Sequence, residues 1–313
     1  MVFFLNQSRP VLGLHEPNIG VRELRQASAD ILVCVHNSID EVRTCLESVV
    51  KTMGPKDRVI IVDDGSQPPT QALCEEVATR LGTTKSLLIR HEEAKGFSQA
   101  ANAGAKQSSQ DICIFLNSDT IVNGDWIDRL SACMDQQGDI GLAGPLSNSG
   151  GWQSIPLLPQ AGKDMFTMSN SPSHLAKLDN YCRRHKVDGP ILVEQLNGFC
   201  LAVKQEVFAT IGYFDDAAFP RGYGEESDYL LRALDTGYKA AVASDCFVYH
   251  AKTKSYGVSE RARLVKLGRV ELERKHGADR ILSAVHQTRH HPALQKIRRR
   301  AILDFILRGW IFR

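Results

Sequence analysis

The sequence predicts an α/β fold in which a mostly parallel β-sheet carries helices on both faces. Apolar runs of strand length alternate with stretches of helical periodicity between residues 29 and 135. The strand-like runs are continuously apolar, which is typical of strands that are covered on both faces. Strand and helix follow one another in regular order, and this pattern favours parallel pairing.

Strands and helices are expected in turn along the first half of the chain. The strands are expected in "ADILVCVHNS", "RVIIVDDGS", "KSLLIRHE" and "DICIFLNSDT". The helices are expected in "DEVRTCLESVVKT", "TQALCEEVATRLG", "GFSQAANAGAKQS" and "DWIDRLSACMDQ". Asp40 is expected to cap the first helix and Gly82 to end the second, because acids favour helix N-caps and glycine favours helix C-termini.

The second half of the chain is less regular. Residues 148–195 are rich in Ser, Gly, Pro and Asn and are long for a structureless loop, so we expect a binding segment there. A strand and then a helix ending at Gly212 are expected in "FCLAVKQEVFATIG". A helix ending at Gly237, followed by a strand, is expected in "GEESDYLLRALDTGYKAAVA". A last helix is expected between Ser259 and Gly277.

Composition excludes several classes of protein. The chain has 313 residues, of which 43% are hydrophobic, and its net charge of +2 does not indicate a nucleic-acid binder. Its eight cysteines form no C-x-x-C pair and lie mostly in apolar runs, so we expect reduced thiols in a cytoplasmic protein. The apolar part of "MVFFLNQSRP" is too short for a signal peptide, and no run reaches the ~18 apolar residues that span a bilayer.

Polar side chains collect where the predicted strands end. Asn37, Asp63, Asp64, Asn117 and Asp119 each follow an apolar run. Ligands of such sheets bind at the carboxyl ends of the strands, so these residues are expected to share one crevice. Asp119 either binds a hard cation such as Mg²⁺ or caps the next segment. Asp63 and Asp64 either contact a base or a ribose hydroxyl or simply form a turn.

Two acids, a histidine and two lysines are further candidates for chemistry. Glu225 and Glu226 stand at a helix start, where a raised pKa would suit a general base but where the helix dipole also favours acids. His250 ends the strand "DCFVYH" and is either structural or a metal ligand. Lys252 and Lys254 follow it, either on a solvated loop or near a phosphate.

Seven segments, taken in order, resemble the successive motifs of the family 2 inverting glycosyltransferases, which have the GT-A fold. They are "VCVHNSIDEVRTCLESV", "IIVDDGS", "AKGFSQAANAGA", "FLNSDT", "GFCLAVKQEVFATIGYFDD", "GYGEESDYLLRALDTGY" and "VYHAKTKSYG". The resemblance covers about residues 29–277 and is closest to the bacterial rhamnosyltransferase-like branch. It implies a Rossmann-like sheet flanked by helices, with a helical C-terminal extension.

The resemblance also implies roles for individual residues. The nucleotide would be bound by Val35, His36, Asn37, Asp63, Gly96, Ser98, Asn102, Asn117 and Ser118. The metal would be bound by Asp119 and His250, although the usual Asp-x-Asp motif reads Asn-Ser-Asp here. Glu226 replaces the usual Asp at the base position, so the base is either Glu225 or Glu226. The acceptor would contact Trp152, Asn197, Gly198 and Asp228, and Asp228 would alternatively orient the helix.

The implied activity is the transfer of a hexose or deoxyhexose, with inversion, from a UDP-, dTDP- or GDP-linked donor. The acceptor would be a glycan or a lipid-linked glycan, the cation Mg²⁺ or Mn²⁺, and the product a cell-surface polysaccharide of the O-antigen or capsule type. One alternative is a sugar nucleotidyltransferase, although its loop after the first strand should be Gly-rich and basic and here reads "HNSIDE". A two-carboxylate glycoside hydrolase and a degenerate, binding-only domain are the others.

Four parts are expected along the chain: an N-terminal extension (1–28), a nucleotide-sugar half (29–147), an acceptor-binding and catalytic half (148–257) and C-terminal helices (258–313). The end of the chain, from residue 291, carries six Lys or Arg against one Asp. Near one helical face fall Ile302, Phe305, Ile306 and Trp310. This segment either lies on the anionic inner face of the cytoplasmic membrane, beside a lipid-linked acceptor, or packs on its own domain.

Overall fold

The computed structural model describes residues 27–158, 168–252 and 258–308. In the first half of the chain it confirms the predicted alternation of strand and helix. The elements are β1 (Ala29–Val35), α1 (Ile39–Thr52), β2 (Arg58–Asp64), α2 (Pro68–Leu81), β3 (Ser86–His91), α3 (Phe97–Ala105), β4 (Ile112–Asn117), β5 (Thr120–Ile121) and α4 (Trp126–Asp135).

The second half contains the predicted elements and several that its sequence did not indicate, among them β6, β7, α5 and α9. The elements are β6 (Ile140–Leu146), the 3₁₀ helix η1 (Gly151–Gln153), α5 (Pro172–Arg184), β7 (Ile191–Val193), β8 (Cys200–Lys204), α6 (Gln205–Ile211), α7 (Glu225–Asp235), β9 (Lys239–Phe247), β10 (Tyr249–His250), α8 (Val258–His276), α9 (Ala278–Arg289) and α10 (Pro292–Arg308). The segment 148–195 is therefore not a loop throughout, because α5 lies within it and packs against β9.

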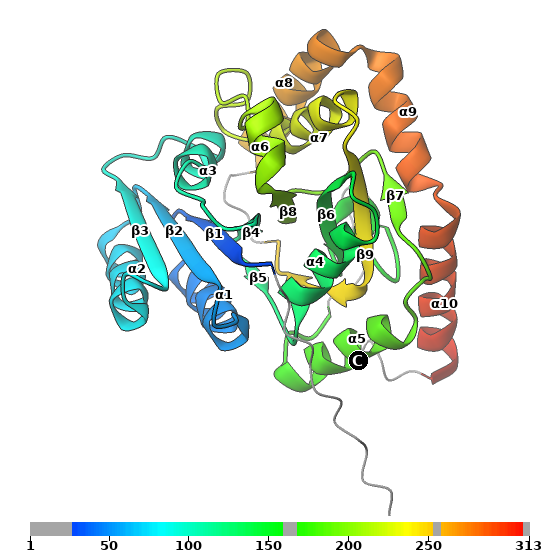
Figure 1. Cartoon of the computed structure of the whole chain (residues 1–313), viewed down its shortest axis with the longest axis horizontal. Helices are drawn as coiled ribbons and strands as arrows, with labels where there is room; N and C mark the ends of the chain where they lie inside the picture. Colours follow the sequence, from blue (N-terminus) through cyan, green and yellow to red (C-terminus); the bar gives the residue numbers. More distant parts are fainter. Residues whose placement is uncertain (1–26, 159–167, 253–257, 309–313) are drawn as a thin grey trace, which may run out of the picture.

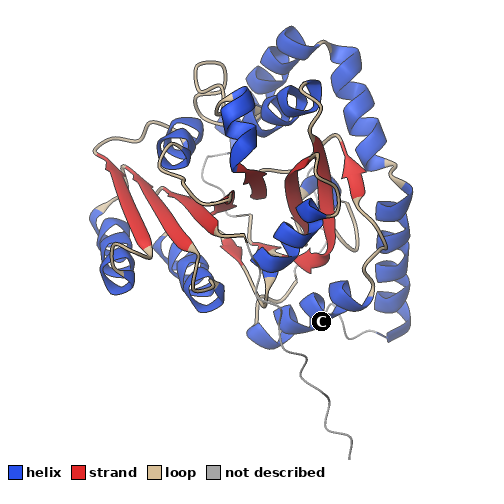
Figure 2. Ribbon diagram, viewed as in Figure 1, coloured by secondary structure: helices blue, strands red, loops and turns tan. Residues whose placement is uncertain are grey.

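Eight strands form one sheet in the order β3-β2-β1-β4-β8-β6-β9-β7 (Figure 2). β1 pairs in parallel with β2 and β4, and β2 pairs in parallel with β3. β8 is antiparallel to β4 and β6, and β7 is antiparallel to β9. β5 and β10 form a separate antiparallel pair in which His250 lies opposite Thr120. The predicted α/β fold with a mostly parallel sheet is confirmed.

Helices cover both faces of the sheet, each over its own apolar cluster (Figure 1). Successive side chains of a strand point to opposite faces, so Ile31 and Val33 of β1 join one cluster and Leu32 joins the other. The first cluster includes residues of α1, α2 and α4, and the second includes residues of α3, α6 and α7. Both faces are buried, which explains why the strands read as continuous apolar runs.

Helix α1 begins two residues earlier than an Asp40 cap would allow. Its N-cap is Ser38, which has a left-handed φ of 56°, and Asp40 lies in the first turn of the helix. The predicted apolar face is otherwise confirmed, since Val42, Cys45 and Leu46 are buried. All eight cysteines of the chain are free thiols in the structure.

The helices α8, α9 and α10 follow one another around the outside of the second half (Figure 1). Helix α10 packs on the core through Leu294, Ile297 and Ala301. No helix in the described ranges is both long and apolar enough to cross a membrane. Of the predicted membrane-facing side chains, those of Phe305, Ile306 and Trp310 lie outside what the structure describes, as do Lys254 and most of the predicted N-terminal extension.

Candidate functional site

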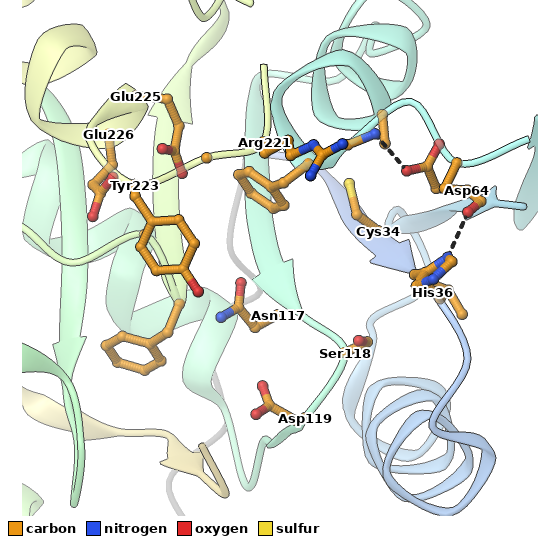
Figure 3. A pocket seen from close by; sticks show the side chains of 18 of the residues that line it. Cys34, His36, Asp64, Asn117, Ser118, Asp119, Arg221, Tyr223, Glu225 and Glu226 are labelled. Carbon is orange, nitrogen blue, oxygen red and sulfur yellow. Dashed lines mark hydrogen bonds between the residues drawn. The ribbon is translucent and has the colours of Figure 1, made fainter. Parts of the chain in front are cut away.

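A pocket of about 700 Å³ opens at the carboxyl ends of β1, β2 and β4 (Figure 3). Most residues predicted to form the site line it together, namely Val35, His36, Gly96, Asn117, Ser118, Asp119, Asn197, Gly198, Glu225, Glu226 and His250. Figure 3 shows Glu225 and Glu226 on one side of the pocket, His36 and Asp64 on the other, and Asp119 apart from both. The fold therefore brings strand ends from the first half to face helix α7 of the second.

The remaining predicted residues do not line this pocket: Asn37, Asp63, Ser98, Asn102, Trp152 and Asp228. Asn37 instead connects two loops, because its side-chain oxygen accepts a hydrogen bond from Gln67 N at 2.8 Å. Trp152 lies in η1, with its ring centre 5.7 Å from the guanidinium carbon of Arg289. Both positions are explained by contacts within the fold.

The two adjacent acids at the end of β2 have different surroundings. Asp63 is buried and forms an ion pair with Arg90. Asp64 lines the pocket, and its carboxylate accepts hydrogen bonds from the backbone N–H groups of Lys95 and Gly96, both at 2.9 Å. Neighbouring strand residues point to opposite sides, so only one of the two can face the pocket. Asp64, and not the predicted Asp63, does so.

The start of helix α3 is fastened to the segment 214–220. Gly96 has a φ of +96°, and a Cβ atom there would come within 2.4 Å of the carbonyl oxygen of Pro220. The Ser98 hydroxyl and the Asn102 amide donate hydrogen bonds to backbone carbonyls of the same segment. Ser98 and Asn102, predicted to bind the nucleotide, therefore stabilise one wall of the pocket from behind.

A tight turn between β4 and β5 presents Asn117, Ser118 and Asp119 to the pocket. The backbone N–H of Asn117 donates to Phe199 O at 2.8 Å, which continues the pairing of β4 beyond the strand. The Thr120 hydroxyl donates to Asn117 O at 2.7 Å and closes the turn. These two bonds place the turn at the edge of the sheet.

Asp119 and His250 meet because β5 pairs with β10. The distance from His250 Nε2 to Asp119 Oδ1 is 3.3 Å. His250 Nδ1 lies 2.9 Å from the carbonyl oxygen of Ser149, which can only accept, so Nδ1 carries the hydrogen of that bond. The ring also stacks on Phe199 at 5.2 Å, which fixes its plane. Nε2, the other ring nitrogen of His250, is thus directed toward the carboxylate of Asp119.

This pair of side chains fits a divalent cation. Neighbouring ligands of an octahedral ion with bonds of 2.0–2.1 Å are about 3 Å apart, close to the separation seen here. Metal-binding histidines commonly donate their second ring N–H to a carbonyl, as His250 does to Ser149. No group of three or more His, Cys, Asp or Glu is placed to hold a metal within the described ranges. The protein would therefore supply two ligands and leave the others to water and substrate.

The two glutamates at the start of α7 form a coupled pair. Burial raises the pKa of both, and the negative charge of Glu226 raises the pKa of Glu225 further. The pKa of each carboxyl group therefore lies above the usual glutamate range. The Oε2 atom of Glu226 is buried and has no hydrogen-bond partner in the described part of the chain. This oxygen is therefore free to accept a proton or a hydrogen bond from a bound molecule.

Asn197 and Gly198 hold the wall beside Glu226. The Asn197 N–H donates to Gln153 Oε1 at 2.7 Å. A Cβ atom at Gly198 would lie 3.4 Å from Glu226 Cβ, so this backbone contacts the glutamate closely. Asp228, two residues further along α7, is fully buried and does not reach the pocket, so it cannot contact an acceptor there.

Several lining residues were not predicted from the sequence. They are Cys34, Ser38, Ala94, Lys95, Phe97, Ala100, Phe199, Pro220, Arg221, Gly222, Tyr223 and Arg261. Arg221 and Tyr223 stand immediately before the glutamates, and this adjacency could have identified them. Arg261 comes from α8, and nothing in its local sequence indicates that α8 reaches the pocket. Lys252, which was considered beside His250, does line it.

The pocket combines groups for two tasks. The Asp119–His250 pair and the cationic side chain of Lys252 can bind an anion with its metal ion. The carboxylate of Glu226, apart from this pair, can take a proton from a hydroxyl group. This division suits a displacement in which the leaving group carries phosphate and the nucleophile is an alcohol.

Comparison with known proteins identifies relatives. The family model described as "Glycosyl transferase family 2" matches residues 30–187. Glycosyltransferase AglE of Haloferax volcanii is 24% identical over 222 residues, which cover 70% of this chain and 66% of AglE. Poly-beta-1,6-N-acetyl-D-glucosamine synthase of Staphylococcus aureus is 30% identical over 110 residues, 35% of this chain and 26% of the synthase. The matches thus span less than two thirds of these relatives' lengths.

Solved structures share the fold. The crystal structure of GalNAc-T7 with UDP, GalNAc and Mn²⁺ superposes with a TM-score of 0.56 at 16% identity, covering 91% of this chain and 56% of that one. At such low identity the likeness concerns the fold, which is that of glycosyltransferases with a GT-A domain.

Proposed function

This chain belongs to glycosyl transferase family 2, and we propose that it transfers a sugar from a nucleoside diphosphate donor to a hydroxyl group of an acceptor, with inversion at the anomeric carbon. One observation carries the proposal: a single pocket holds the Asp119–His250 pair and, apart from it, the Glu225–Glu226 pair. The curated glycosyltransferase relatives support it.

Glu226 is the proposed general base. The acceptor hydroxyl gives its proton to Glu226 while its oxygen bonds to the anomeric carbon, and the bond from that carbon to the diphosphate oxygen breaks. Attack from the side opposite the leaving group inverts the configuration, and no covalent enzyme intermediate is needed. Glu225, whose pKa is raised by burial and by the charge of Glu226, is proposed to keep its proton while Glu226 acts as the base. A positioned base contributes about 10²–10⁴ in rate.

Asp119 and His250 are the proposed metal ligands. When bound, Mg²⁺ or Mn²⁺ would neutralise charge on the departing diphosphate. The Ser149 carbonyl keeps His250 Nε2 available for this purpose. Asn117 stands where a second carboxylate is common in the family, so the site carries less negative charge and should bind a cation weakly until the diphosphate adds its own oxygens.

The donor side is expected near β1, β2 and the start of α3. Val35, His36 and Asp64 lie at these strand ends, where nucleotides bind in doubly wound sheets. The proposed donor is a hexose or deoxyhexose linked to UDP, dTDP or GDP. GalNAc-T7, which shares the fold, was solved with UDP and Mn²⁺.

A glycan or lipid-linked glycan in cell-surface polysaccharide synthesis is the proposed acceptor. The similarity to a poly-beta-1,6-N-acetyl-D-glucosamine synthase supports this class. Contact with the inner face of the cytoplasmic membrane is part of this proposal, since α10 leaves Lys296, Arg299 and Arg300 exposed. Replacing these three by Ser spares the packing of α10, and unchanged binding to anionic liposomes would rule out the contact.

The proposed activity is tested with a panel of UDP-, dTDP- and GDP-sugars, with and without Mn²⁺ or Mg²⁺. We expect one nucleotide to raise the melting temperature in a metal-dependent way and the matching sugar nucleotide to release nucleoside diphosphate. Binding without release, even with glycan acceptors present, would indicate a binding-only domain. Absence of any metal-dependent nucleotide binding would contradict the proposal.

A further inference from the structure

We infer that helix α8 of the C-terminal extension positions the general base, and that Lys275 is the residue through which it acts. This inference rests on the proposed function for the identity of the base. Lys275 does not touch the pocket and is a positioning residue. Its importance follows from the contacts between α8 and the segment 223–228, which carries both glutamates.

One face of α8 lies against this segment. A Cβ atom at Gly268 would fall 1.7 Å from Tyr223 O, so the α8 backbone itself contacts Tyr223. One turn later, Leu272 packs behind Gly224, at 3.2 Å from the position of a Cβ atom there. Lys275 is one further turn along, and residues spaced by three or four share a helix face. Successive turns of α8 thus contact successive parts of the segment 223–228.

Asp228 is the anchor for this face. It is fully buried, lies two residues beyond Glu226 in the same turn of α7, and accepts hydrogen bonds from the side chains of two cationic residues and one histidine. Lys275 Nζ is 2.7 Å and His276 Nε2 2.8 Å from its Oδ1, and Arg232 Nε is 2.9 Å from its Oδ2. A buried carboxylate requires such partners, because an unpaired charge away from water is costly.

Unlike Arg232 and His276, the other two partners of Asp228, Lys275 also forms an ion pair with a second carboxylate. Its Nζ also lies 2.6 Å from Asp215 Oδ2, at the beginning of the loop that leads through Arg221 and Tyr223 into α7. The same ammonium group is 5.6 Å from the ring centre of Phe219 in that loop. One side chain therefore connects α8 to both ends of the segment 215–228. Arg232 also links Asp228 to the carbonyls of Ile211 and Tyr213, but it lies on α7 itself. We infer that loss of Lys275 leaves α7 helical and loosens its attachment to α8 and to the loop at Asp215.

The test compares Lys275→Met, Lys275→Arg and Arg274→Met in the full chain. Arg274 is the matched control, because its side chain is 69% exposed and pairs only with Glu271 among the ion pairs of α8. We expect Lys275→Met to speed amide hydrogen exchange in residues 222–230 while leaving 112–121 unchanged. Its kcat should fall about tenfold or more, with the KM of the donor nearly constant, since small misplacements of a catalytic group cost that much. Lys275→Arg should restore most of the rate, and Arg274→Met should behave as wild type.

Two results would overturn the inference. One is unchanged exchange in residues 222–230 of Lys275→Met. The other is faster exchange spread evenly over the chain with a fall in melting temperature, which is the mark of general destabilisation. If wild type turns over none of the sugar nucleotides in the panel, the proposed function fails, yet the exchange data still decide whether Lys275 holds the glutamate segment.

Discussion

His250 Nε2 lies 3.3 Å from Asp119 Oδ1, although the two residues are far apart in the chain, one in the turn before β5 and the other in β10. The contact depends on the pairing of β5 with β10 and on the bond from His250 Nδ1 to Ser149 O. Because Nδ1 is committed to the carbonyl, the other ring nitrogen is left for a cation or a proton. The proposed two-ligand metal site therefore rests on contacts that the fold itself makes.

Replacing Asp119 by Ala should abolish the metal dependence of nucleotide binding. The remaining imidazole is a single ligand and cannot hold a hard cation against water. In a thermal-shift assay with Mn²⁺ and the nucleotide that stabilises wild type, Asp119→Ala should show only the shift seen without metal. Asp135→Ala, on the exposed side of α4, should match wild type. A full metal-dependent shift in Asp119→Ala would remove this residue from the metal site.

Replacing Asn117 by Asp should make the metal site stronger in the absence of a nucleotide. The added carboxylate supplies a hard, charged ligand next to Asp119, and charge count is what tunes the affinity of such sites. Calorimetric titration of the free protein with Mn²⁺ should give binding about tenfold tighter than wild type. Asn123→Asp adds the same charge outside the pocket lining and serves as the control. Equal affinities for wild type and Asn117→Asp would show that Asn117 does not face the cation.

Gly96→Ala should destabilise the protein more than Gly82→Ala. Both glycines have positive φ, +96° and +74°, so alanine strains the backbone at either site by about 1–3 kcal/mol. Only at Gly96 would the new Cβ atom also collide with Pro220 O. Urea unfolding should therefore show a larger loss of free energy for Gly96→Ala, accompanied by weaker nucleotide binding. Equal losses of unfolding free energy in the two variants would mean that the segment around Pro220 can move away from the new Cβ atom without destabilising the protein.

The rate should depend on pH through Glu226. Its pKa is raised by burial, and only its ionised form can act as a base. As pH falls through this raised pKa, Glu226 takes up a proton and kcat/KM should decline, at a higher pH than for an exposed glutamate. The acid limb of kcat/KM measures this directly. A limb at or below the ordinary glutamate value would place the base elsewhere.

The sequence predicted where the strands end. It did not always predict which residue at a strand end faces the pocket. Continuous apolar runs located β1, β2 and β4, and with them the turn that carries Asp119. Asp63 and Asp64 are adjacent at the end of β2. Which of them faces the pocket depends on the register in which β2 pairs with β1, and the sequence does not give that register. The pair of β5 and β10 is too short to leave an apolar pattern.

The long-range packing of the second half could not be predicted from the sequence, for a different reason. Asp228 looked like a pocket acid beside Glu226, yet it is buried against Arg232, Lys275 and His276, and two of these residues come from α8. Periodicity indicated that α8 is a helix, but nothing local says which face of it meets α7. Segment 148–195 likewise looked irregular because its helix, α5, is flanked by stretches rich in Ser, Gly, Pro and Asn.

The most direct test of the account is the rate of sugar transfer by Glu226→Gln beside Glu225→Gln, at saturating donor and metal. Glu225→Gln retains a hydrogen-bond donor toward Glu226, so it should keep most of the wild-type kcat. Glu226→Gln cannot accept the proton and should lose about 10²–10⁴ in kcat while binding the nucleotide as wild type does. A Glu226→Gln variant that transfers sugar at the wild-type rate, or a Glu225→Gln variant that alone is inactive, would contradict the assignment of Glu226 as the base.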